Sequence, residues 1–320
     1  MARFFLALFV IFPLSLSAAT KASIALNWVP EPEFGGIYQA QRGGAFEKHN
    51  LDMTIQPGGA GAPTWQLVAS GKATFAVASA DEVVIARSRG ADVVAIFAIY
   101  QTCPQGIMSH ASRGFKSIDD VFNHPGTIAM EIGLPYGKFL QQKFGFEKVK
   151  RVPYDGGIGN FLADKNVSQQ CFVFSEPLAA KKAGSDPQVF LVSDAGYNPY
   201  TGVVITTTAA LKDKTTIDAM TTSLVEGWRA YLDDPKPANE MMGKLNKTMD
   251  QPTFAAAAEA QKPLIESDET KSNRLGWMSK ERWEQLCKQL VDLKVVAPGG
   301  GASPADQCFY NAPKPEGGSK

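Results

Sequence analysis

Histidine and cysteine are scarce in this chain, which limits the metal and enzyme chemistry that it can carry. The 320 residues include three histidines and four cysteines, and no two cysteines have the Cys-x-x-Cys spacing of a zinc site. The sequence also contains no Gly-x-Ser-x-Gly nucleophile elbow and no glycine-rich phosphate loop that ends in lysine. These absences argue against a structural zinc ion and against the common hydrolase and nucleotide-binding sites.

A net charge is also missing. The 32 basic and 32 acidic residues balance to a formal charge of zero, so no broad basic surface is expected to attract nucleic acid or an anionic membrane. We therefore expect no nucleic-acid partner, and any ligand must be recognised by a local site.

Long apolar runs are confined to the first residues. Arg3 precedes an apolar run over residues 4–16, and small residues follow at 17–19. This run is shorter than the roughly 20 residues that span a bilayer, and the pattern is typical of a cleavable secretory signal. We predict a signal peptide over residues 1–19, cleaved after Ala19, and a mature protein in the periplasm of a Gram-negative cell. No cysteine lies near that cleavage site, so a lipid anchor is not expected.

Export would bring the four cysteines into an oxidising compartment, where an even number permits disulfides. Cys287 and Cys308 are close in sequence, and a disulfide between them would hold the C-terminal segment in place. Cys103 and Cys171 lie in apolar surroundings, which is typical of buried free thiols.

Strand-like and helix-like segments alternate over the first two thirds of the chain. Runs with the apolar pattern of strands occur at residues 22–26, 52–56, 75–78, 93–99, 126–130, 148–153, 170–173, 190–193 and 203–207. Helical patterns lie between most of them, at residues 35–48, 63–70, 80–89, 118–122, 137–144, 160–163 and 176–183. This alternation indicates parallel sheets covered on both faces. The remainder is mostly helical, with segments at 216–233, 236–248, 251–264 and 279–293.

The chain length and two Gly/Pro-containing breaks predict two lobes. A chain of 320 residues exceeds the roughly 250–300 residues at which single cores stop growing. Residues 101–106 and 196–200 carry the glycine and proline expected at hinge crossings. We therefore divide the chain into lobe one (20–102 and 201–311), lobe two (103–200) and a loose tail (312–320).

The segment after the first predicted strand has the character of a binding loop. Asn27 and Trp28 end that strand, and a stretch with two prolines and two glycines follows. Glu31 and Glu33 lie in this stretch, before helical spacing resumes near Tyr38. An aromatic face beside an amide and two carboxylates can stack on a flat ring and accept hydrogen bonds from its exocyclic donors. The alternative is that Trp28 is buried in the core.

The run LNWVPEPEFGGIYQA at residues 26–40 resembles the start of mature substrate-binding proteins that serve ABC importers of thiamine-pyrimidine precursors. Sulfonate, nitrate and riboflavin binders are wider relatives of that family. Further matches follow in order at residues 69–73, 75–82, 93–96, 116–121 and 175–179. The resemblance therefore extends from about residue 23 to about residue 208.

The resemblance implies both a fold and a role. The implied fold is the type II periplasmic binding protein fold, an α/β architecture in which each lobe is a mainly parallel sheet flanked by helices, with further helices near the C-terminus. The implied role is the capture of a small heteroaromatic ligand between the lobes and its delivery to an ABC permease in the inner membrane, without a cofactor. We expect a monomer. A riboflavin, sulfonate or nitrate binder and a periplasmic sensor module are the alternatives.

Ligands of open α/β sheets bind beyond the carboxyl ends of the strands, and the residues there form the candidate site. Ser79 and Asp81 stand at a helix N-terminus that can hold a polar substituent, or they only cap that helix. Asp155 can be a contact or an ordinary turn residue, and Glu176 a contact or a helix-start carboxylate. Tyr200 can close over a ring or pack the hinge. The candidate set is Asn27, Trp28, Glu31, Glu33, Tyr38, Ser79, Asp81, Gln105, Gly133, Tyr136, Asp155, Glu176 and Tyr200.

This candidate set is rich in carboxylates and aromatic rings and contains no basic residue. A sulfonate or nitrate needs cationic groups or several N–H donors, whereas an aminopyrimidine offers donors that carboxylates accept. The set therefore favours a cationic or donor-rich heteroaromatic ligand.

An enzyme is the main alternative of another class, because the same fold includes fungal enzymes that make the thiamine pyrimidine from pyridoxal phosphate and an active-site histidine. Their cysteine-rich iron-binding motif is absent here. His49, His110 and His124 fall in polar segments typical of solvated histidines. We therefore expect a binding protein rather than an enzyme.

Overall fold

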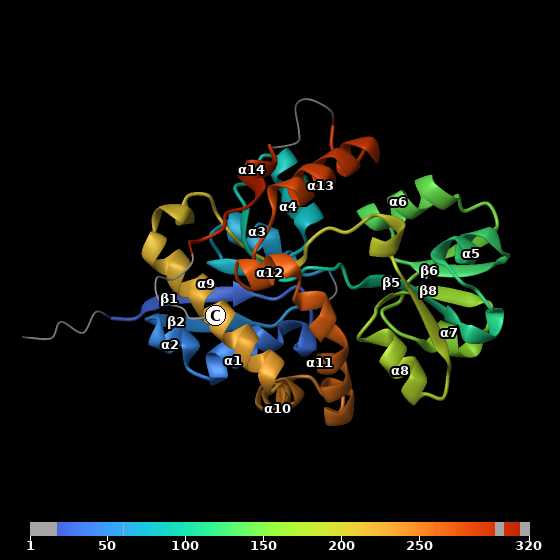
Figure 1. Ribbon diagram of the computed structural model, residues 1–320, viewed down its shortest axis with the longest axis horizontal. Coiled ribbons are helices and arrows are strands. Elements are labelled where there is room, and N and C mark those ends of the chain that lie inside the picture. The colour runs from blue at the N-terminus through green and yellow to red at the C-terminus, as the bar shows by residue number, and fades with distance from the viewer. Residues whose placement is uncertain (1–17, 60, 298–303, 314–320) are drawn as a thin grey trace, which may run out of the picture.

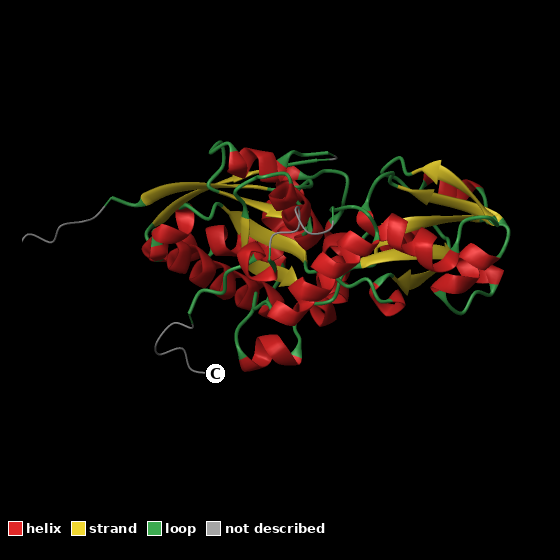
Figure 2. Cartoon of the chain, turned by 90° about the horizontal axis from the view of Figure 1, so that it is seen from above, coloured by secondary structure: helices red, strands yellow, loops and turns green. Residues whose placement is uncertain are grey.

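Two five-stranded sheets lie at opposite ends of an elongated molecule (Figures 1 and 2). The computed structural model describes residues 18–59, 61–297 and 304–313. Most of the predicted signal peptide and most of the predicted tail therefore fall outside the described residues. Within the described part of the chain, no helix combines the length and the apolar character needed to cross a membrane.

The first sheet has the strand order β2-β1-β3-β10-β4. Its strands are β1 (Thr20–Ala25), β2 (Leu51–Gln56), β3 (Phe75–Ala78), β4 (Val94–Tyr100) and β10 (Thr201–Thr206). β1 pairs in parallel with β2 and β3, and β10 runs antiparallel between β3 and β4. β3 and β4 are buried along their whole length, as their uninterrupted apolar sequences predict for strands covered on both faces.

The second sheet has the strand order β7-β6-β8-β5-β9. Its strands are β5 (Gln105–His110), β6 (Gly126–Met130), β7 (Val149–Pro153), β8 (Val167–Phe172) and β9 (Pro187–Leu191). β6 is parallel to β7 and β8, and β5 is antiparallel to β8 and β9. In each sheet the reversed strand is the one that the chain forms on entering from the other sheet. The predicted mainly parallel α/β architecture is confirmed.

The sequence pattern did not predict β5, which is buried over all six residues. Polar Gln105, Ser109 and His110 interrupt its apolar period, although all three are buried. His110 also corrects the expectation of a solvated histidine, because its ring stacks on Phe161 at 3.9 Å between centroids and its Nε2 lies 2.8 Å from the Phe161 carbonyl oxygen.

Helices cover both sheets. Those around the first sheet are α1 (Gly35–Arg42), α2 (Ala45–Lys48), α3 (Thr64–Ala69), α4 (Ala80–Ser88), α9 (Lys214–Asp233), α10 (Lys236–Leu245), α11 (Gln251–Ile265), α12 (Asp268–Ser272), α13 (Lys280–Asp292) and α14 (Ala305–Cys308). Those around the second sheet are α5 (Ile118–Asn123), α6 (Pro135–Phe144), α7 (Gly159–Ala163) and α8 (Glu176–Lys182). The helical character predicted for the chain after β10 is therefore confirmed.

Two glycines let α1 approach α9 closely. A Cβ atom on Gly36 would lie 2.2 Å from the ring of Trp228, and one on Gly35 would lie 2.1 Å from the ring of Tyr231. Both rings are buried. The Gly-Gly pair of the predicted binding loop therefore serves helix packing directly behind that loop.

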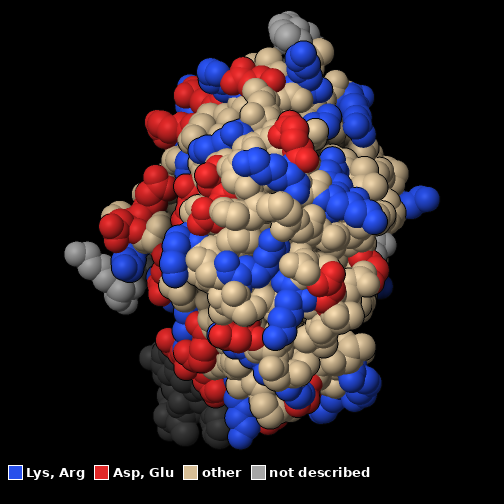
Figure 3. Space-filling view, turned by 90° about the vertical axis from the view of Figure 1, so that its right-hand side faces the viewer, with Lys and Arg blue, Asp and Glu red and all other residues tan. Residues whose placement is uncertain are grey.

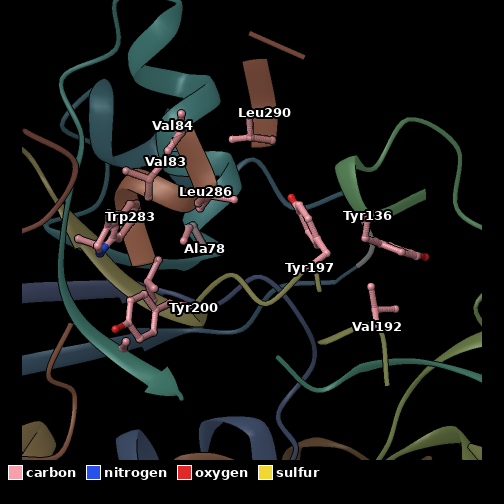
Figure 4. Close-up of a cluster of buried hydrophobic side chains, with 14 of the residues drawn as sticks. Ala78, Val83, Val84, Tyr136, Val192, Tyr197, Tyr200, Trp283, Leu286 and Leu290 are labelled. Atoms are coloured by element: carbon pink, nitrogen blue, oxygen red, sulfur yellow. The ribbon is translucent and has the colours of Figure 1, made fainter. Parts of the chain in front are cut away.

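On another part of the first sheet, α13 packs against α4. Trp283, Leu286 and Leu290 of α13 lie beside Val83 and Val84 of α4 in one buried cluster (Figure 4). This packing supports the N-terminal end of α4, which faces the second sheet.

The two segments that join the sheets are hydrogen-bonded to each other. The backbone N–H of Cys103 in the first crossing donates to Oδ1 of Asn198 in the second, at 2.8 Å. Farther from the crossings, Lys182 of α8 forms an ion pair of 2.5 Å with Asp250, the N-cap residue of α11. The lobe boundaries predicted from the sequence stay a prediction.

The four cysteines are free thiols in the structure. The disulfide considered for Cys287 and Cys308 is therefore not formed in it. These two side chains are nevertheless in contact, and the hydrogen bond from Cys308 lowers the pKa of the Cys287 thiol.

Basic and acidic side chains are mixed on the face of the molecule that the second sheet forms (Figure 3). Figure 3 views the molecule from the end formed by the second sheet and shows Lys and Arg side chains interspersed with Asp and Glu. Mixed charge of this kind produces no broad field of one sign.

Candidate functional site

A cavity of about 510 Å³ lies between the two sheets and is lined by residues of both. The loop after β1 and the start of α4 line it from the first sheet, and the ends of β6, β7 and β8 line it from the second. Of the sequence-predicted candidates, the structure brings these together around the cavity: Asn27, Trp28, Glu31, Glu33, Ser79, Asp81, Gln105, Tyr136, Asp155 and Glu176.

Three predicted candidates do not line the cavity. Tyr38 lies on α1 and is buried in the core of the first sheet. Gly133 occupies a left-handed turn, with φ of 94°, between β6 and α6. Tyr200 packs the hinge, since Arg282 lies 3.7 Å from its ring centroid and its hydroxyl accepts a hydrogen bond from the Ser279 N–H. Figure 4 shows Tyr200 beside Trp283.

Trp28 lies at the wall of the cavity, between the cavity and the core of the first sheet. It lies in the loop after β1, is partly buried, and packs against the core cluster of the first sheet while it also lines the cavity. A hydrogen bond of 3.0 Å from the Gly58 N–H to the Trp28 carbonyl ties this residue to the loop after β2. A ring fixed in this way can stack on a flat ligand with little loss of side-chain entropy.

The Pro-Glu-Pro-Glu segment is held by helices that come much later in the chain. Nε2 of Gln261 on α11 donates to the Pro32 carbonyl at 2.8 Å. Nδ2 of Asn246, at the end of α10, donates to the Pro30 carbonyl at 3.1 Å. Tyr100 in turn donates to Oε1 of Gln261 at 2.5 Å. These bonds satisfy the backbone of a buried loop and position the two glutamates that it carries.

Glu31, Glu33 and Glu176 form an acidic cluster in the cavity, and we call this set the glutamate cluster. Burial, followed by the charge of Glu33, raises the pKa of Glu31 well above its usual value. Burial, followed by the charge of Glu176, raises the pKa of Glu33 to about 8, although a hydrogen bond with Asn27 opposes this. No Lys, Arg or His is among the described residues that line the cavity.

Glu176 differs from its two neighbours because both of its oxygens already accept hydrogen bonds. Oε1 accepts from the Tyr154 hydroxyl at 2.8 Å, and Oε2 accepts from the Phe172 N–H at 2.8 Å. Burial raises its pKa, and these two bonds act in the opposite direction. Hydrogen bonds of this kind favour the ionised form of a carboxyl group.

The N-terminus of α4 is occupied by its own carboxylates. Ser79 donates its backbone N–H to Oε2 of Glu82 at 2.8 Å, and the Glu82 N–H donates to Oδ1 of Asp81 at 2.9 Å. The Tyr197 hydroxyl donates to the second Asp81 oxygen at 3.0 Å. Ser79 and Asp81 therefore line the cavity and cap the helix at the same time, so that a ligand anion would meet carboxylates where free N–H groups would attract it.

The sequence-based candidates miss several residues that line the cavity. Gln170, inside β8, accepts hydrogen bonds through Oε1 from the Tyr136 hydroxyl and the Glu131 N–H, at 2.5 and 2.6 Å. Glu131 directly follows β6 and lies in the stretch 131–136 that the strand-end rule predicts to face the ligand, of which only Gly133 and Tyr136 entered the candidate set. A glutamine in the interior of a strand carries no such signal.

Asp155 also has the turn role that was its alternative. It is exposed, and its oxygens accept hydrogen bonds from the Gly157 N–H at 3.1 Å and from Nδ2 of Asn160 at 3.2 Å.

Comparison with known protein families identifies one relationship that covers most of the chain. The family described as NMT1/THI5 like matches residues 31–238. A similar protein is the formylaminopyrimidine-binding protein of Halalkalibacterium halodurans, which is 23% identical over 310 residues, with 90% of this chain and 92% of that protein aligned.

Solved structures share the fold at low sequence identity. The periplasmic aliphatic sulphonate binding protein of Escherichia coli superimposes with a TM-score of 0.70 at 12% identity, over 94% of this chain and 95% of that one. The alkanesulfonate-binding protein of Xanthomonas axonopodis pv. citri gives a TM-score of 0.66 at 12% identity, over 92% and 100% of the two chains. The chain thus has the two-lobed fold of type II periplasmic binding proteins, and it belongs to the NMT1/THI5-like family.

Proposed function

We propose that this protein is the periplasmic solute-binding component of an ABC importer, and that it captures a small heteroaromatic ligand, a thiamine pyrimidine precursor or a similar compound. The single observation that carries the proposal is the cavity in which Trp28 stands beside the glutamate cluster with no basic side chain among the described lining residues. The name of the formylaminopyrimidine-binding relative supports the same ligand class.

The cavity suits a ligand of this size and chemistry. A volume of about 510 Å³ falls within the range of roughly 300–1,000 Å³ typical of small-molecule sites. Trp28 offers a face for stacking, and the carboxyl groups of Glu31 and Glu33 offer hydrogen-bond partners for exocyclic amino groups. We propose the ten candidates that line the cavity as the ligand contacts.

A sulfonate or nitrate fits these residues less well, although relatives of that kind share the fold. Asp81 and Glu82 occupy the N–H groups at the start of α4, where an anion would otherwise bind. An anion in this cavity would also meet the glutamate cluster without a compensating cation. These contacts favour the pyrimidine proposal over the sulfonate and nitrate alternatives.

Transport completes the proposal. The signal peptide over residues 1–19 would direct the chain to the periplasm, the two lobes would close on the ligand, and the closed form would dock on the permease. We propose a binding protein rather than an enzyme, since none of the three histidines lines the cavity. His49, for example, lies 3.0 Å from a carboxylate oxygen of Glu226.

Ligand-dependent thermal unfolding of the mature protein, from Thr20, tests the proposal. The compounds are 4-aminopyrimidine thiamine precursors, riboflavin, taurine and nitrate. A ligand at about 100 times its dissociation constant adds about 2.7 kcal/mol to the free energy of unfolding. A shift with a pyrimidine alone supports the proposed ligand class. A shift only with taurine, nitrate or riboflavin keeps the transport role and refutes the ligand class.

A further inference from the structure

The glutamate cluster cannot be fully ionised while the cavity is empty. Burial raises the pKa of all three carboxyl groups, the charge of Glu176 adds to this at Glu31 and Glu33, and the described residues that line the cavity supply no cation. Carboxyl groups buried together without a cation hold protons, because the ionised forms lose hydration and repel one another. At least one member of the cluster is therefore a neutral acid at neutral pH.

Glu33 is the member whose protonated form is best suited to meet a ligand. Its side chain is 3% exposed, and its Oε1 has no hydrogen-bond partner. Glu176 has both oxygens engaged as acceptors. A buried oxygen without a hydrogen-bond partner raises the free energy of the protein. A ligand group that forms a hydrogen bond to this oxygen removes that cost and therefore binds more tightly.

The neighbours of Glu33 leave it without a compensating charge. Glu31 on the same loop and Glu176 on α8 are acids, and Tyr100 on β4 is held neutral by burial, which raises its pKa well above 10. Gln261 on α11, which packs against this loop, is uncharged. On α1, burial raises the pKa of Tyr38 to about 12. No charged group described beside Glu33 therefore offsets its ionised form, and burial keeps the proton on it.

A neutral carboxyl group has a donor and an acceptor side by side, whereas a carboxylate only accepts. The complementary edge is a ring nitrogen next to a carbon that bears an amino group. We propose that Glu33 binds the ligand as a neutral carboxylic acid, with its O–H donating to a ring nitrogen and its C=O accepting from the adjacent amino group. This inference rests on the proposed function and narrows its ligand class to neutral heteroaromatic amines with that edge.

The neighbours of Glu33 on its own loop fit this arrangement. Asn27, Trp28 and Glu33 belong to one loop and line one cavity, so a ring stacked on Trp28 presents its edge along the same wall. The terminal torsion of a glutamate has broad minima, so either oxygen of Glu33 can take the donor or the acceptor position. Oδ1 of Asn27, which also lacks a partner, can accept from the second N–H of the amino group.

Calorimetric titration with 4-amino-5-hydroxymethyl-2-methylpyrimidine tests this arrangement. The proposal expects constant affinity between pH 6.5 and 7.5 and a fall of about tenfold per pH unit above about pH 8, where Glu33 loses its proton. At pH 7 the binding heat should be the same in phosphate and in Tris, since no proton is taken up. An analogue methylated at N3, the ring nitrogen next to the amino-bearing carbon, lacks this acceptor and should bind at least about tenfold more weakly.

Two substitutions distinguish binding by a neutral Glu33 side chain from binding by an ionised one. Glu33→Gln keeps one donor and one acceptor in the same plane, so it should lower the affinity by about tenfold at most and remove the fall above pH 8. Glu33→Leu should lower the affinity by about a hundredfold. Glu240→Gln, at an exposed position on α10 outside the cavity lining, is the control and should keep the fall above pH 8. Unfolding of each variant without ligand shows that it is folded.

The outcomes also separate this inference from the proposed function. Wild-type protein that binds the pyrimidine with equal affinity from pH 6.5 to 9.5, or a Glu33→Gln variant as weak as Glu33→Leu, overturns the neutral-acid role and leaves the function standing. Uptake of a proton on binding at pH 7 also overturns the neutral-acid role of Glu33 and leaves the proposed function standing. Wild-type protein that binds no aminopyrimidine at any pH overturns both.

Discussion

Glu33→Gln is predicted to stabilise the ligand-free protein near neutral pH. Burial raises the pKa of this carboxyl from 4.5 to about 8 in the folded state. The folded state therefore holds a proton that the unfolded chain releases above about pH 4.5. The stability that Glu33 contributes is complete below the unfolded pKa and is lost as the pH rises toward the folded pKa.

The size of this loss follows from the pH window. Each pH unit above the unfolded pKa removes about 1.4 kcal/mol until the folded pKa is reached. At pH 7 the loss is therefore about 3 kcal/mol. Glutamine does not ionise, so the variant keeps this stability, in line with the common finding that binding-site residues are not optimised for stability.

Thermal unfolding of the two proteins at pH 4.5, 6, 7 and 8 measures the effect. At about 2 °C per kcal/mol for a chain of this size, the midpoint of Glu33→Gln should exceed that of the wild type by about 6 °C at pH 7 and by little at pH 4.5. Glu240→Gln, at an exposed position on α10, is the control and should show no such trend. A variant that unfolds at or below the wild-type temperature at pH 7, or a gain that persists undiminished at pH 4.5, would refute the reasoning.

Three further substitutions test other parts of the site. Trp28→Leu should weaken the binding of an aromatic ligand by about tenfold, since stacking contributes roughly 0.5–1.5 kcal/mol beyond area burial; titration calorimetry measures this, and unchanged affinity would remove Trp28 from the site. Gln261→Leu removes the donor to the Pro32 carbonyl and should lower the free energy of unfolding by about 1–3 kcal/mol; denaturant unfolding measures the loss, and an unchanged free energy of unfolding would contradict it. Gly36→Ala would place a Cβ 2.2 Å from the Trp228 ring and should cost about 1–3 kcal/mol or more; an unchanged unfolding midpoint would show that α1 and α9 can separate freely.

The loop after β1, which lines the cavity, could be located from the sequence because its signals are local. A short apolar strand, two prolines, two glycines and an aromatic residue beside carboxyl groups all lie within residues 22–38. The parts that hold the loop could not be predicted. Gln261 lies 229 residues from Pro32, and Asn246 lies 216 residues from Pro30, so no local pattern connects them.

The packing of two aromatic candidates, Tyr38 and Tyr200, could not be predicted from the sequence either. Tyr38 lies on α1, which follows the loop after β1, and Tyr200 directly precedes β10; both are buried away from the cavity. The side on which a large ring packs depends on the neighbouring helices. Tyr38 is in the core cluster that includes Trp228 of α9, and Tyr200 is in the one that includes Trp283 of α13. A strand-end rule locates such residues near a site without deciding which way they face.

The charge of the ligand is decided by a few side chains rather than by the fold. Sulfonate-binding proteins share this architecture, so the architecture itself accepts anions as well as other solutes. In this chain Asp81 and Glu82 take the N–H groups of the α4 N-terminus, and the residues that the structure describes around the glutamate cluster include no Lys, Arg or His that lines the cavity. Removing the acids at α4 alone would leave an anion facing the glutamate cluster, and neutralising that cluster alone would leave the helix terminus occupied. If the proposed function holds, a change to an anionic ligand would therefore require both groups to change together.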